Sequence, residues 1–318
     1  MGIAKVLVSI VFSFRNEAEN LPELIRQVGE VLESCMIDYE LIFVNDCSSD
    51  ASPDILKGLC AKDKRIKIVN LSRRFGYNQG FLIGIKYAAG DIVITMDADL
   101  QDPPQLIPQM IEKYRQGADV VHTVRSDRKG ESVVKSGLTR MAYKLIRLVA
   151  GLDLIENAGN FKLFSRRAVD RMAQFDEKEP YFRGLAAWVG FEQVQVSYVR
   201  QKRFAGKTHF PILRSTGPIK EFINGLTSFS MLPLVAPIIL TLFGFMVWLT
   251  VTVALLLTGS LIENLPLAIV SLAVLMNMFF IGIMGIYIHK IWNEVNSRPL
   301  GIVESTLNID TTKNNQNP

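Results

Sequence analysis

Residues 92–104 read IVITMDADLQDPP, an apolar run that changes abruptly into a cluster of carboxylates. The run over residues 91–96 has the length and the Val and Ile content of a buried parallel strand. In parallel sheets, ligands bind outside the carboxyl ends of the strands, which is where this strand would present its acidic residues. The stretch therefore predicts a fold class and also the place of a functional site.

The same pattern continues on both sides of this strand. Apolar runs rich in Val and Ile alternate with segments whose apolar residues recur at helical spacing. Strands are expected at residues 5–14, 39–45, 66–71, 91–96, 119–124, 160–163 and 193–198, and helices at residues 16–35, 52–60, 78–89, 104–116, 131–150, 166–175 (with Ser165 as N-cap) and 180–189. Such alternation predicts an α/β domain with a mostly parallel sheet and helices on both faces.

Polar residues follow several of these strands. Asn16 and Glu17 follow the first strand, Asp46 follows the second, and Asp97 and Asp99 follow the fourth. Because parallel strands end at one edge of the sheet, we expect these side chains to line one active site.

Composition narrows the class of protein. The 318 residues are 49% hydrophobic and carry a formal net charge of +4, and the mean hydropathy of +0.22 is high for a wholly soluble protein. The charge is too small to predict nucleic-acid binding. Cys35, Cys47 and Cys60 have neither the spacing of a disulfide framework nor that of a zinc site, so we expect free thiols in a reducing compartment.

The apolar excess is concentrated in residues 232–257 and 265–288. Each run can cross a hydrocarbon core of about 30 Å as a helix. A buried helical core of a soluble protein is the alternative, which the length of both runs disfavours. Lys and Arg flank the pair but are absent from the loop between them, and no signal-peptide pattern precedes the domain. A two-span hairpin in the plasma membrane is expected, with the catalytic domain and both termini in the cytoplasm.

The expected domain organisation follows from these segments. A catalytic domain is expected over residues 1–214, the two spans over residues 232–289, and a cytoplasmic tail with a disordered end over residues 290–318. Residues 215–231 have the pattern of an amphipathic helix in the membrane interface. The same pattern would also suit packing against the catalytic domain.

The carboxylates of Asp97 and Asp99 are hard oxygen ligands that suit Mg²⁺ or Mn²⁺, and a diphosphate commonly completes such a shell. A solvated acidic turn is the alternative. The position directly after a buried strand favours the metal.

The sequence around these residues, Met96 to Pro104, closely resembles the DADLQDPP signature of glycosyltransferase family 2, and within it the dolichol- and undecaprenyl-phosphate sugar synthases. The resemblance implies a GT-A (Rossmann-like) fold and a divalent metal held by Asp97, Asp99 and Gln101. It also implies a nucleotide-sugar donor and a polyprenyl phosphate acceptor. It extends over nearly the whole domain before the apolar runs.

Other segments match the family with departures. The family's Pro-x-Tyr-Asn-Glu appears as Ser13 to Glu17, and its Val-Asp-Asp-Gly-Ser appears as Val44 to Ser48, with Asn45 and Cys47 as substitutions. The resemblance implies a nucleotide-sugar site made of Ser13, Arg15, Glu17, Asp46, Arg74, Asp97 and Ala98, in which Asp46 reads the base. Turn-forming and surface roles for these residues remain the alternative.

Basic residues are candidates for the acceptor phosphate, because guanidinium groups donate paired hydrogen bonds to phosphate. The family uses comparable positions for this purpose, which here are Arg125, Arg128, Arg200, Arg203 and Lys207. We count Arg125, Arg128 and Arg203 with Asp97 and Asp99 as the catalytic set. Attraction to anionic lipid head groups is the alternative for the basic residues.

Asn157 and Asn160 stand where relatives usually have aspartates, one of them a candidate base. Asparagine cannot accept a proton, so either the chain is inactive or no protein base is required. We favour the second, because a phosphate with a second pKa of about 6 is already an anionic nucleophile.

The expected reaction is an inverting transfer of one sugar, best guess glucose from UDP-glucose, to undecaprenyl phosphate for cell-surface polymer modification. GDP-mannose, UDP-N-acetylglucosamine and UDP-aminoarabinose are alternative donors. An inactive nucleotide-sugar-binding membrane scaffold and a nucleotide-sugar hydrolase are rival functions. A separate flippase is expected, and the membrane helices offer surfaces for a homo-oligomer.

Overall fold

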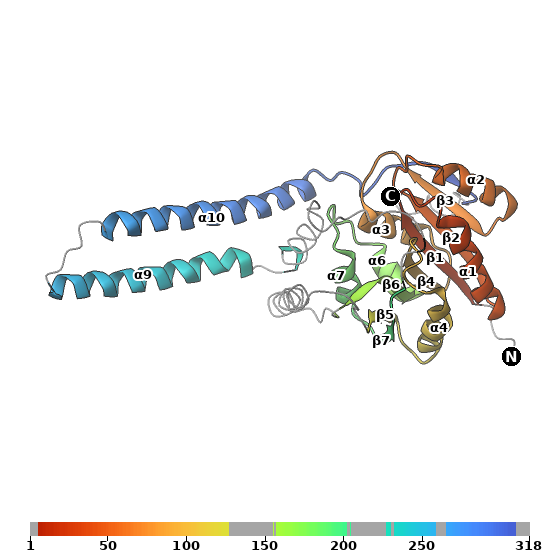
Figure 1. The fold of residues 1–318 in the computed structure, drawn as a ribbon, viewed down its shortest axis with the longest axis horizontal. Coiled ribbons are helices and arrows are strands. Elements are labelled where there is room, and N and C mark those ends of the chain that lie inside the picture. Colours follow the sequence, from red (N-terminus) through yellow and green to blue (C-terminus); the bar gives the residue numbers. More distant parts are fainter. Residues whose placement is uncertain are drawn as a thin grey trace.

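The protein is described from a computed structural model, which places residues 6–126, 155, 157–201, 204, 227–229, 232–258 and 265–309. Within these ranges an α/β domain carries two long helices that extend away from it (Figure 1). The expected helix over residues 131–150 and most of the expected amphipathic helix lie outside the described residues.

The centre of the domain is an eight-stranded sheet in the order β7-β5-β6-β4-β1-β2-β3-β8. Its strands are β1 Leu7–Phe14, β2 Asp38–Asn45, β3 Ile66–Leu71, β4 Ile92–Asp97, β5 Val120–Arg125, β6 Ala158–Ser165, β7 Gln193–Tyr198 and β8 Val303–Leu307. β6 is antiparallel to β4 and β5, and β8 is antiparallel to β3, whereas the other pairings are parallel. The expected mostly parallel sheet is confirmed.

Helices cover both faces of the sheet and form two hydrophobic cores. One face packs against α1 Leu21–Ser34, α2 Ser52–Lys62, the 3-10 turn η1 Pro104–Leu106 and α4 Ile107–Arg115. The other packs against α3 Tyr77–Tyr87, α6 Arg166–Met172 and α7 Phe182–Trp188. Strands such as β1 and β4 are buried on both faces, which explains their continuous apolar sequences.

Most expected elements are present, with shifted ends. Ser165 caps α6, since its hydroxyl accepts a hydrogen bond from the Ala168 amide. The helix expected from residue 16 begins only at Leu21: Asn16 adopts a left-handed conformation with φ of 56°, and Pro22 occupies the first turn of the helix, where proline is tolerated. β8 is an addition to the expected sheet: a tail is expected over residues 290–318, yet part of this segment returns to the sheet beside β3.

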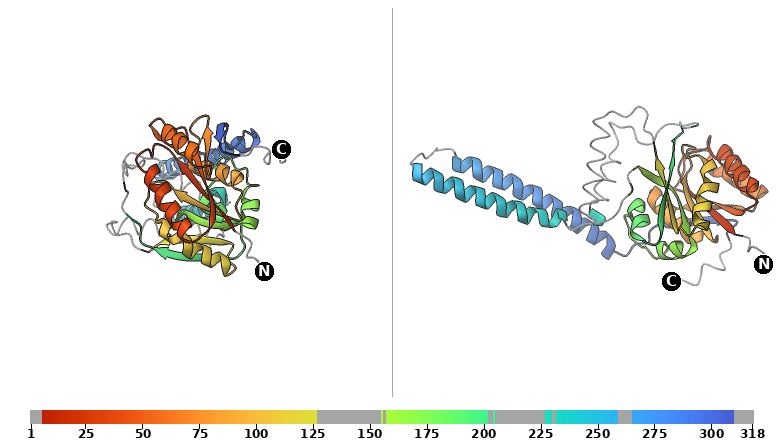
Figure 2. Two further views of the ribbon diagram at one scale, coloured as in Figure 1. Left: turned by 90° about the vertical axis from the view of Figure 1, so that its right-hand side faces the viewer. Right: turned by 90° about the horizontal axis from the view of Figure 1, so that it is seen from below.

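The two long helices are α9 Leu232–Thr258 and α10 Leu265–Val295, which lie side by side in both views (Figures 1 and 2). Within α10, Leu272–Val295 is long and apolar enough to cross a membrane, and none of it is buried inside the structure. α9 contains a shorter apolar segment, Leu240–Val251. The two expected long helices are present, and the membrane crossing of each remains a proposal.

The C-terminal end of α10 docks on the α/β domain. The Glu294 carboxylate accepts a hydrogen bond from the Lys178 amide at 2.9 Å, and the Lys290 ammonium donates to the Ser228 hydroxyl at 2.9 Å. Phe229 packs against the ring of Tyr181, with 6.4 Å between centroids. The end of the expected amphipathic segment therefore contacts the domain, which was the alternative interpretation of its apolar residues.

Candidate active site

Strand register brings the candidate residues to one edge of the sheet. Ser13 at the end of β1 pairs in register with Asp97 at the end of β4. Arg125 and Tyr198 end the neighbouring strands β5 and β7 and pair with each other in register. The antiparallel β6 begins at this same edge with Ala158. The expected site is therefore assembled from several segments that are distant in the sequence.

Three carboxylates gather after β4. Asp97 is half-buried and Asp99 is 8% exposed, and the Asp99 carboxylate accepts a hydrogen bond from the Gln101 amide at 3.2 Å. Burial, followed by the charges of Asp102 and Asp99, raises the pKa of Asp97 to about 6. Burial and the two neighbouring carboxylates together outweigh the opposing charges of Arg125 and Arg183, so ionisation of Asp97 is disfavoured.

Asp102 is a site residue that the sequence interpretation missed. It is fully buried, and its carboxylate accepts a hydrogen bond from the Tyr198 hydroxyl. Arg125 and Arg200 lie 3.8 and 3.9 Å from its Oδ1 atom. Its Oδ2 atom has no hydrogen-bond partner among the described residues. Asp102 thus links the acidic cluster to two arginines that were predicted to bind phosphate.

The acidic cluster fits a divalent cation in charge and ligand type. Asp97 and Asp99 offer carboxylate oxygens and Gln101 an amide oxygen, which are the ligands that Mg²⁺ and Mn²⁺ accept. The described residues contain no group of three His, Cys, Asp or Glu side chains arranged to hold a metal. A cation here would therefore require further oxygens from a bound ligand.

Ser13 and α3 approach each other very closely. The Ser13 hydroxyl is buried and forms no hydrogen bond with a described residue. A Cβ atom on Gly80 would lie 2.1 Å from the Ser13 Oγ atom. Glycine at position 80 therefore allows α3 to pack against the end of β1, beside the edge that carries Asp97.

Asp46 organises the loop that precedes α3. Its carboxylate accepts hydrogen bonds from the backbone amides of Phe75 at 2.6 Å and Gly76 at 3.1 Å. Asn45 accepts a hydrogen bond from the Ser48 amide at 2.9 Å, and Cys47 adopts a left-handed φ of 54°. Glycine suits that conformation best, which accounts for the family's usual residue at position 47.

The other residues predicted to bind the nucleotide sugar have mixed environments. Glu17 is 8% exposed and accepts a hydrogen bond from the Asn20 side chain at 2.5 Å, and Arg15 donates to the Cys47 carbonyl at 3.4 Å. Arg74 is exposed. Ala98 packs in the hydrophobic core, so any contact with a nucleotide would fall to its backbone.

Two of the predicted phosphate ligands are described. Arg125 donates to the Tyr198 hydroxyl at 3.1 Å. Arg200 lies 4.0 Å from the Asp99 carboxylate, because the Gln201 amide bonds to the Gln101 carbonyl at 3.0 Å and holds this segment over the acidic cluster. Arg128, Arg203 and Lys207 lie outside the described residues.

The two asparagines have distinct positions. Asn160 donates from its amide to Asp97 at 3.4 Å and accepts from Arg183 at 3.4 Å. Asn157 forms the turn before β6 with a φ of 61°, a conformation that asparagine tolerates. An aspartate at position 160 would add a fourth carboxylate against Asp97, so asparagine reduces the repulsion there.

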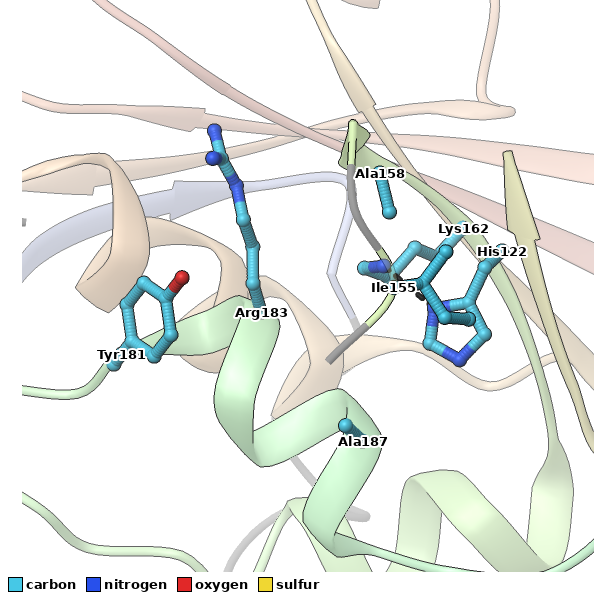
Figure 3. A pocket seen from close by; sticks show the side chains of 7 residues that line it. All are labelled: His122, Ile155, Ala158, Lys162, Tyr181, Arg183 and Ala187. Atoms are coloured by element: carbon cyan, nitrogen blue, oxygen red, sulfur yellow. Dashed lines mark hydrogen bonds between the residues drawn. The ribbon is translucent and has the colours of Figure 1, made fainter. Parts of the chain in front are cut away.

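The sequence interpretation also missed a network of buried basic residues behind Asn160. Lys162 of β6 and His122 of β5 pair in register, with 2.6 Å between Nζ and Nδ1. Together with Arg183, Tyr181 and others they line a small cavity of about 10 Å³ (Figure 3). A lysine between two apolar residues of a buried strand was the available signal in the sequence, but its partner depends on the register of β5 and β6.

Comparison with known proteins identifies relatives of the chain. The model of the family described as "Glycosyl transferase family 2" matches residues 9–173. An uncharacterized glycosyltransferase of Bacillus subtilis (strain 168), YkcC, is 38% identical over 315 residues, which are 96% of this chain and 95% of that protein. The SfII prophage-derived bactoprenol glucosyl transferase of Shigella flexneri is 33% identical over 305 residues, covering 94% of this chain and 98% of that protein.

The fold also resembles a solved structure, that of glucosyl-3-phosphoglycerate synthase from Mycobacterium tuberculosis in complex with Mn²⁺, uridine diphosphate and phosphoglyceric acid. The TM-score is 0.52 at 18% sequence identity, and the match covers 71% of this chain and 78% of that chain. At this identity the likeness concerns the fold alone.

Proposed function

The chain belongs to glycosyl transferase family 2, and we propose that it transfers one sugar from a nucleotide diphosphate to a polyprenyl phosphate at a membrane surface. The observation that carries this proposal is the juxtaposition at one sheet edge of the carboxylates Asp97, Asp99 and Asp102 with Arg125 and Arg200. Such an edge offers a cation site for a diphosphate and guanidinium groups for a second phosphate.

The lipid acceptor is supported by a relative and by the helices. The relative named as a bactoprenol glucosyl transferase matches along 94% of this chain, which includes the apolar helices. α10 also docks directly on the α/β domain, which would hold the site near a bilayer.

Two spans are supported by the sheet itself. β8 follows the hairpin in sequence, yet it pairs with β3 of the domain that precedes the hairpin. Both ends of the hairpin must therefore lie on one side of a membrane, which requires an even number of crossings. We propose that α9 and α10 both cross the plasma membrane, with the domain and both termini on the cytoplasmic side.

UDP-glucose is the donor we propose, with GDP-mannose, UDP-N-acetylglucosamine and UDP-aminoarabinose as alternatives. Ser13, Glu17, Asp46 and the backbone of Ala98 would line the nucleotide site, with Arg15 and Arg74 at its margin. The resemblance of these segments to the donor-binding segments of the family supports this assignment. A separate flippase would then present the product on the other side of the membrane.

The chemistry we propose is a single displacement. An oxygen of the acceptor phosphate attacks C1 of the sugar while the bond from C1 to the nucleotide diphosphate breaks, so the anomeric configuration inverts. A phosphate with a second pKa of about 6 is already anionic near neutral pH, so no protein base is needed where Asn157 and Asn160 stand. Arg125 and Arg200 orient the acceptor. A Mg²⁺ or Mn²⁺ ion held by Asp97, Asp99 and Gln101 would supply positive charge to the departing diphosphate.

A membrane scaffold that binds nucleotide sugar without turnover is the second candidate. The substitution of both family aspartates by asparagine favours it. The position of Asn160 argues against it, since the side chain bonds Asp97 and Arg183 as part of the site.

The test follows radiolabel from UDP-glucose into the lipid phase, with purified full-length protein, undecaprenyl phosphate and Mg²⁺ in detergent. Asp99→Ala is the matched control, and we expect it to lower transfer by about 10²–10³-fold, the usual effect of removing one group that stabilises transition-state charge. Absence of lipid-linked label from a panel of UDP- and GDP-sugars would favour the scaffold. Free sugar released without lipid would instead indicate a hydrolase.

A further inference from the structure

Lys162 is a buried base with an unusual set of neighbours. It is 1% exposed, and among the described residues no carboxylate bonds or pairs with it. Its one hydrogen-bond partner in the described part of the chain is the His122 ring. An ammonium group buried without a counter-charge is costly, so the protonation state of Lys162 must depend strongly on what binds nearby.

The hydrogen bonds around His122 fix which of its ring nitrogens donates and which accepts. The Gln193 amide donates to the carbonyls of Ala187 at 3.0 Å and Gly190 at 2.8 Å, which turns its Oε1 atom toward His122 Nε2 at 2.8 Å. His122 Nε2 must then carry the hydrogen and donate it, so Nδ1 is left to accept from Lys162. Burial and the charge of Lys162 lower the pKa of His122 to about 3, which keeps the ring neutral.

The rest of the surroundings is mainly positive. Among the described residues, the titratable or charged groups that face Lys162 from the neighbouring elements are His122 and Arg125 of β5, Arg183 of α7 and Tyr181 just before it. Burial, then Arg183 and Arg125, lower the pKa of Lys162 to about 7. The amine is therefore largely neutral above pH 7 while the site holds no anion.

Lys162 is connected to the reacting edge through two elements. It lies two residues from Asn160 on β6, and Asn160 bonds both Asp97 and Arg183. Lys162 of β6 and Arg183 of α7 both line the same small cavity, whose volume of about 10 Å³ suits one water molecule (Figure 3). A phosphate held near Arg125 and Arg183 would reduce the repulsion that now opposes charge on Lys162.

We propose that Lys162 is a positioning residue that takes up a proton when the acceptor phosphate binds. Its charge then adds to those of Arg125 and Arg183 around Asn160. The proton comes from solvent and is held on the amine nitrogen, and no bond of the substrate changes. Because binding linkage is reciprocal, the protonated amine strengthens phosphate binding by the same factor by which phosphate favours protonation. This inference rests on the proposed function, since it requires a phosphate acceptor at this edge.

The test is calorimetric titration of full-length protein, saturated with UDP and Mg²⁺, with undecaprenyl phosphate in detergent. Two buffers of different ionisation enthalpy report the protons taken up. We expect wild type to take up about one proton per acceptor more than Lys162→Met at pH 8 and about the same number at pH 6, since the free amine with a pKa of about 7 is mostly neutral only at the higher pH. Titration of the acceptor phosphate is common to both proteins and cancels in this difference. The affinity of the wild type should fall by up to about tenfold per pH unit above 7.

Three variants serve as controls. Lys162→Met should abolish this uptake and weaken binding at pH 6, whereas Lys162→Arg, which stays charged, should bind without uptake and with little pH dependence. Lys86→Met, at an exposed lysine of α3, should behave as wild type. A purely structural lysine would instead give variants that change stability and leave the proton count unaltered.

Stability provides a readout that does not depend on substrate. Because the folded pKa of Lys162 lies below the unfolded value of 10.5, the unfolded chain binds more protons between about pH 7 and pH 10.5. Wild type should therefore gain stability relative to Lys162→Met as the pH rises through this window. Parallel stability curves for the two proteins would overturn the inference.

The outcomes separate the inference from the proposed function. Sugar transfer by wild type with no proton uptake beyond that of Lys162→Met overturns the inference and leaves the function standing. Proton uptake without transfer from any donor supports the inference and overturns the function. If the protein neither binds the acceptor nor transfers sugar, the inference and the proposed function are both overturned.

Discussion

The two halves of the sheet edge satisfy their polar groups in different ways. The half formed by β1 to β4, which we propose binds the donor, is called the donor half; its side chains bond mainly to backbone: Asp46 to Phe75 and Gly76, and Asn45 to Ser48. The half formed by β5 to β7 and α7, which we propose binds the acceptor, is called the acceptor half; its charged side chains face one another. Backbone bonding fixes the shape of a site before a ligand arrives, whereas clustered charges respond to the charge of the ligand.

The largest expected effect comes from removing the Asp102 carboxylate, which lies between the two halves. Asp102→Ala should lower the free energy of unfolding by about 3 kcal/mol, because Arg125 would lose its buried counter-charge. Tyr198→Phe, which removes only the hydroxyl bonded to Asp102, should cost about 1 kcal/mol. Thermal unfolding of both variants in detergent measures the difference. Equal stability of the two would show that charge compensation at Asp102 is unimportant.

A packing change tests the donor half. Gly80→Ala would place a methyl group 2.1 Å from the Ser13 Oγ atom, and should cost about 2 kcal/mol. Adding Ser13→Gly removes both Ser13 atoms within 3.0 Å of that methyl group. The double variant should therefore recover part of the loss, which a double-mutant cycle measures. Additive costs would indicate that α3 shifts away from β1 rather than remaining rigidly packed.

The smallest expected effect concerns the outer rim of the donor half. Asn308 donates from its side-chain amide to the carbonyls of Cys60 at 2.8 Å and Ile66 at 2.9 Å. Asn308→Gly keeps the left-handed backbone but loses these bonds, and should cost about 1 kcal/mol. Its acceptor affinity should equal that of wild type. A change in acceptor affinity would show that the two halves are coupled through the sheet.

Sequence patterns predicted the elements that are long or strongly apolar. The strands over residues 66–71 and 193–198 have the expected bounds, and the three Cys residues are free thiols as expected. Residues 92–104 indicated the edge of the sheet at which the candidate residues gather, because carboxylates that directly follow a buried parallel strand lie where such sheets bind their ligands.

What the sequence did not predict depends on tertiary pairing. β8 is a short edge strand with little apolar content, so its pattern resembles that of a loop. Asp102 directly follows Gln101 in the sequence, but its role as a site residue depends on its contacts with Tyr198 and Arg200, which only the packing of β7 provides. The pairing of Lys162 with His122 requires the register of β5 and β6, which the intervening residues do not reveal.

The late position of β8 has a consequence for biosynthesis. About 100 residues, including both apolar helices, separate β7 from β8, so a ribosome adding roughly 5–20 residues per second needs roughly 5–20 s to reach the last strand. During that interval the edge of β3 has no partner, and an open edge can pair with other chains. The hairpin would therefore enter the bilayer before the domain is closed. A nascent chain that stalls after the hairpin would be anchored but would expose this edge, which distinguishes it from a finished molecule.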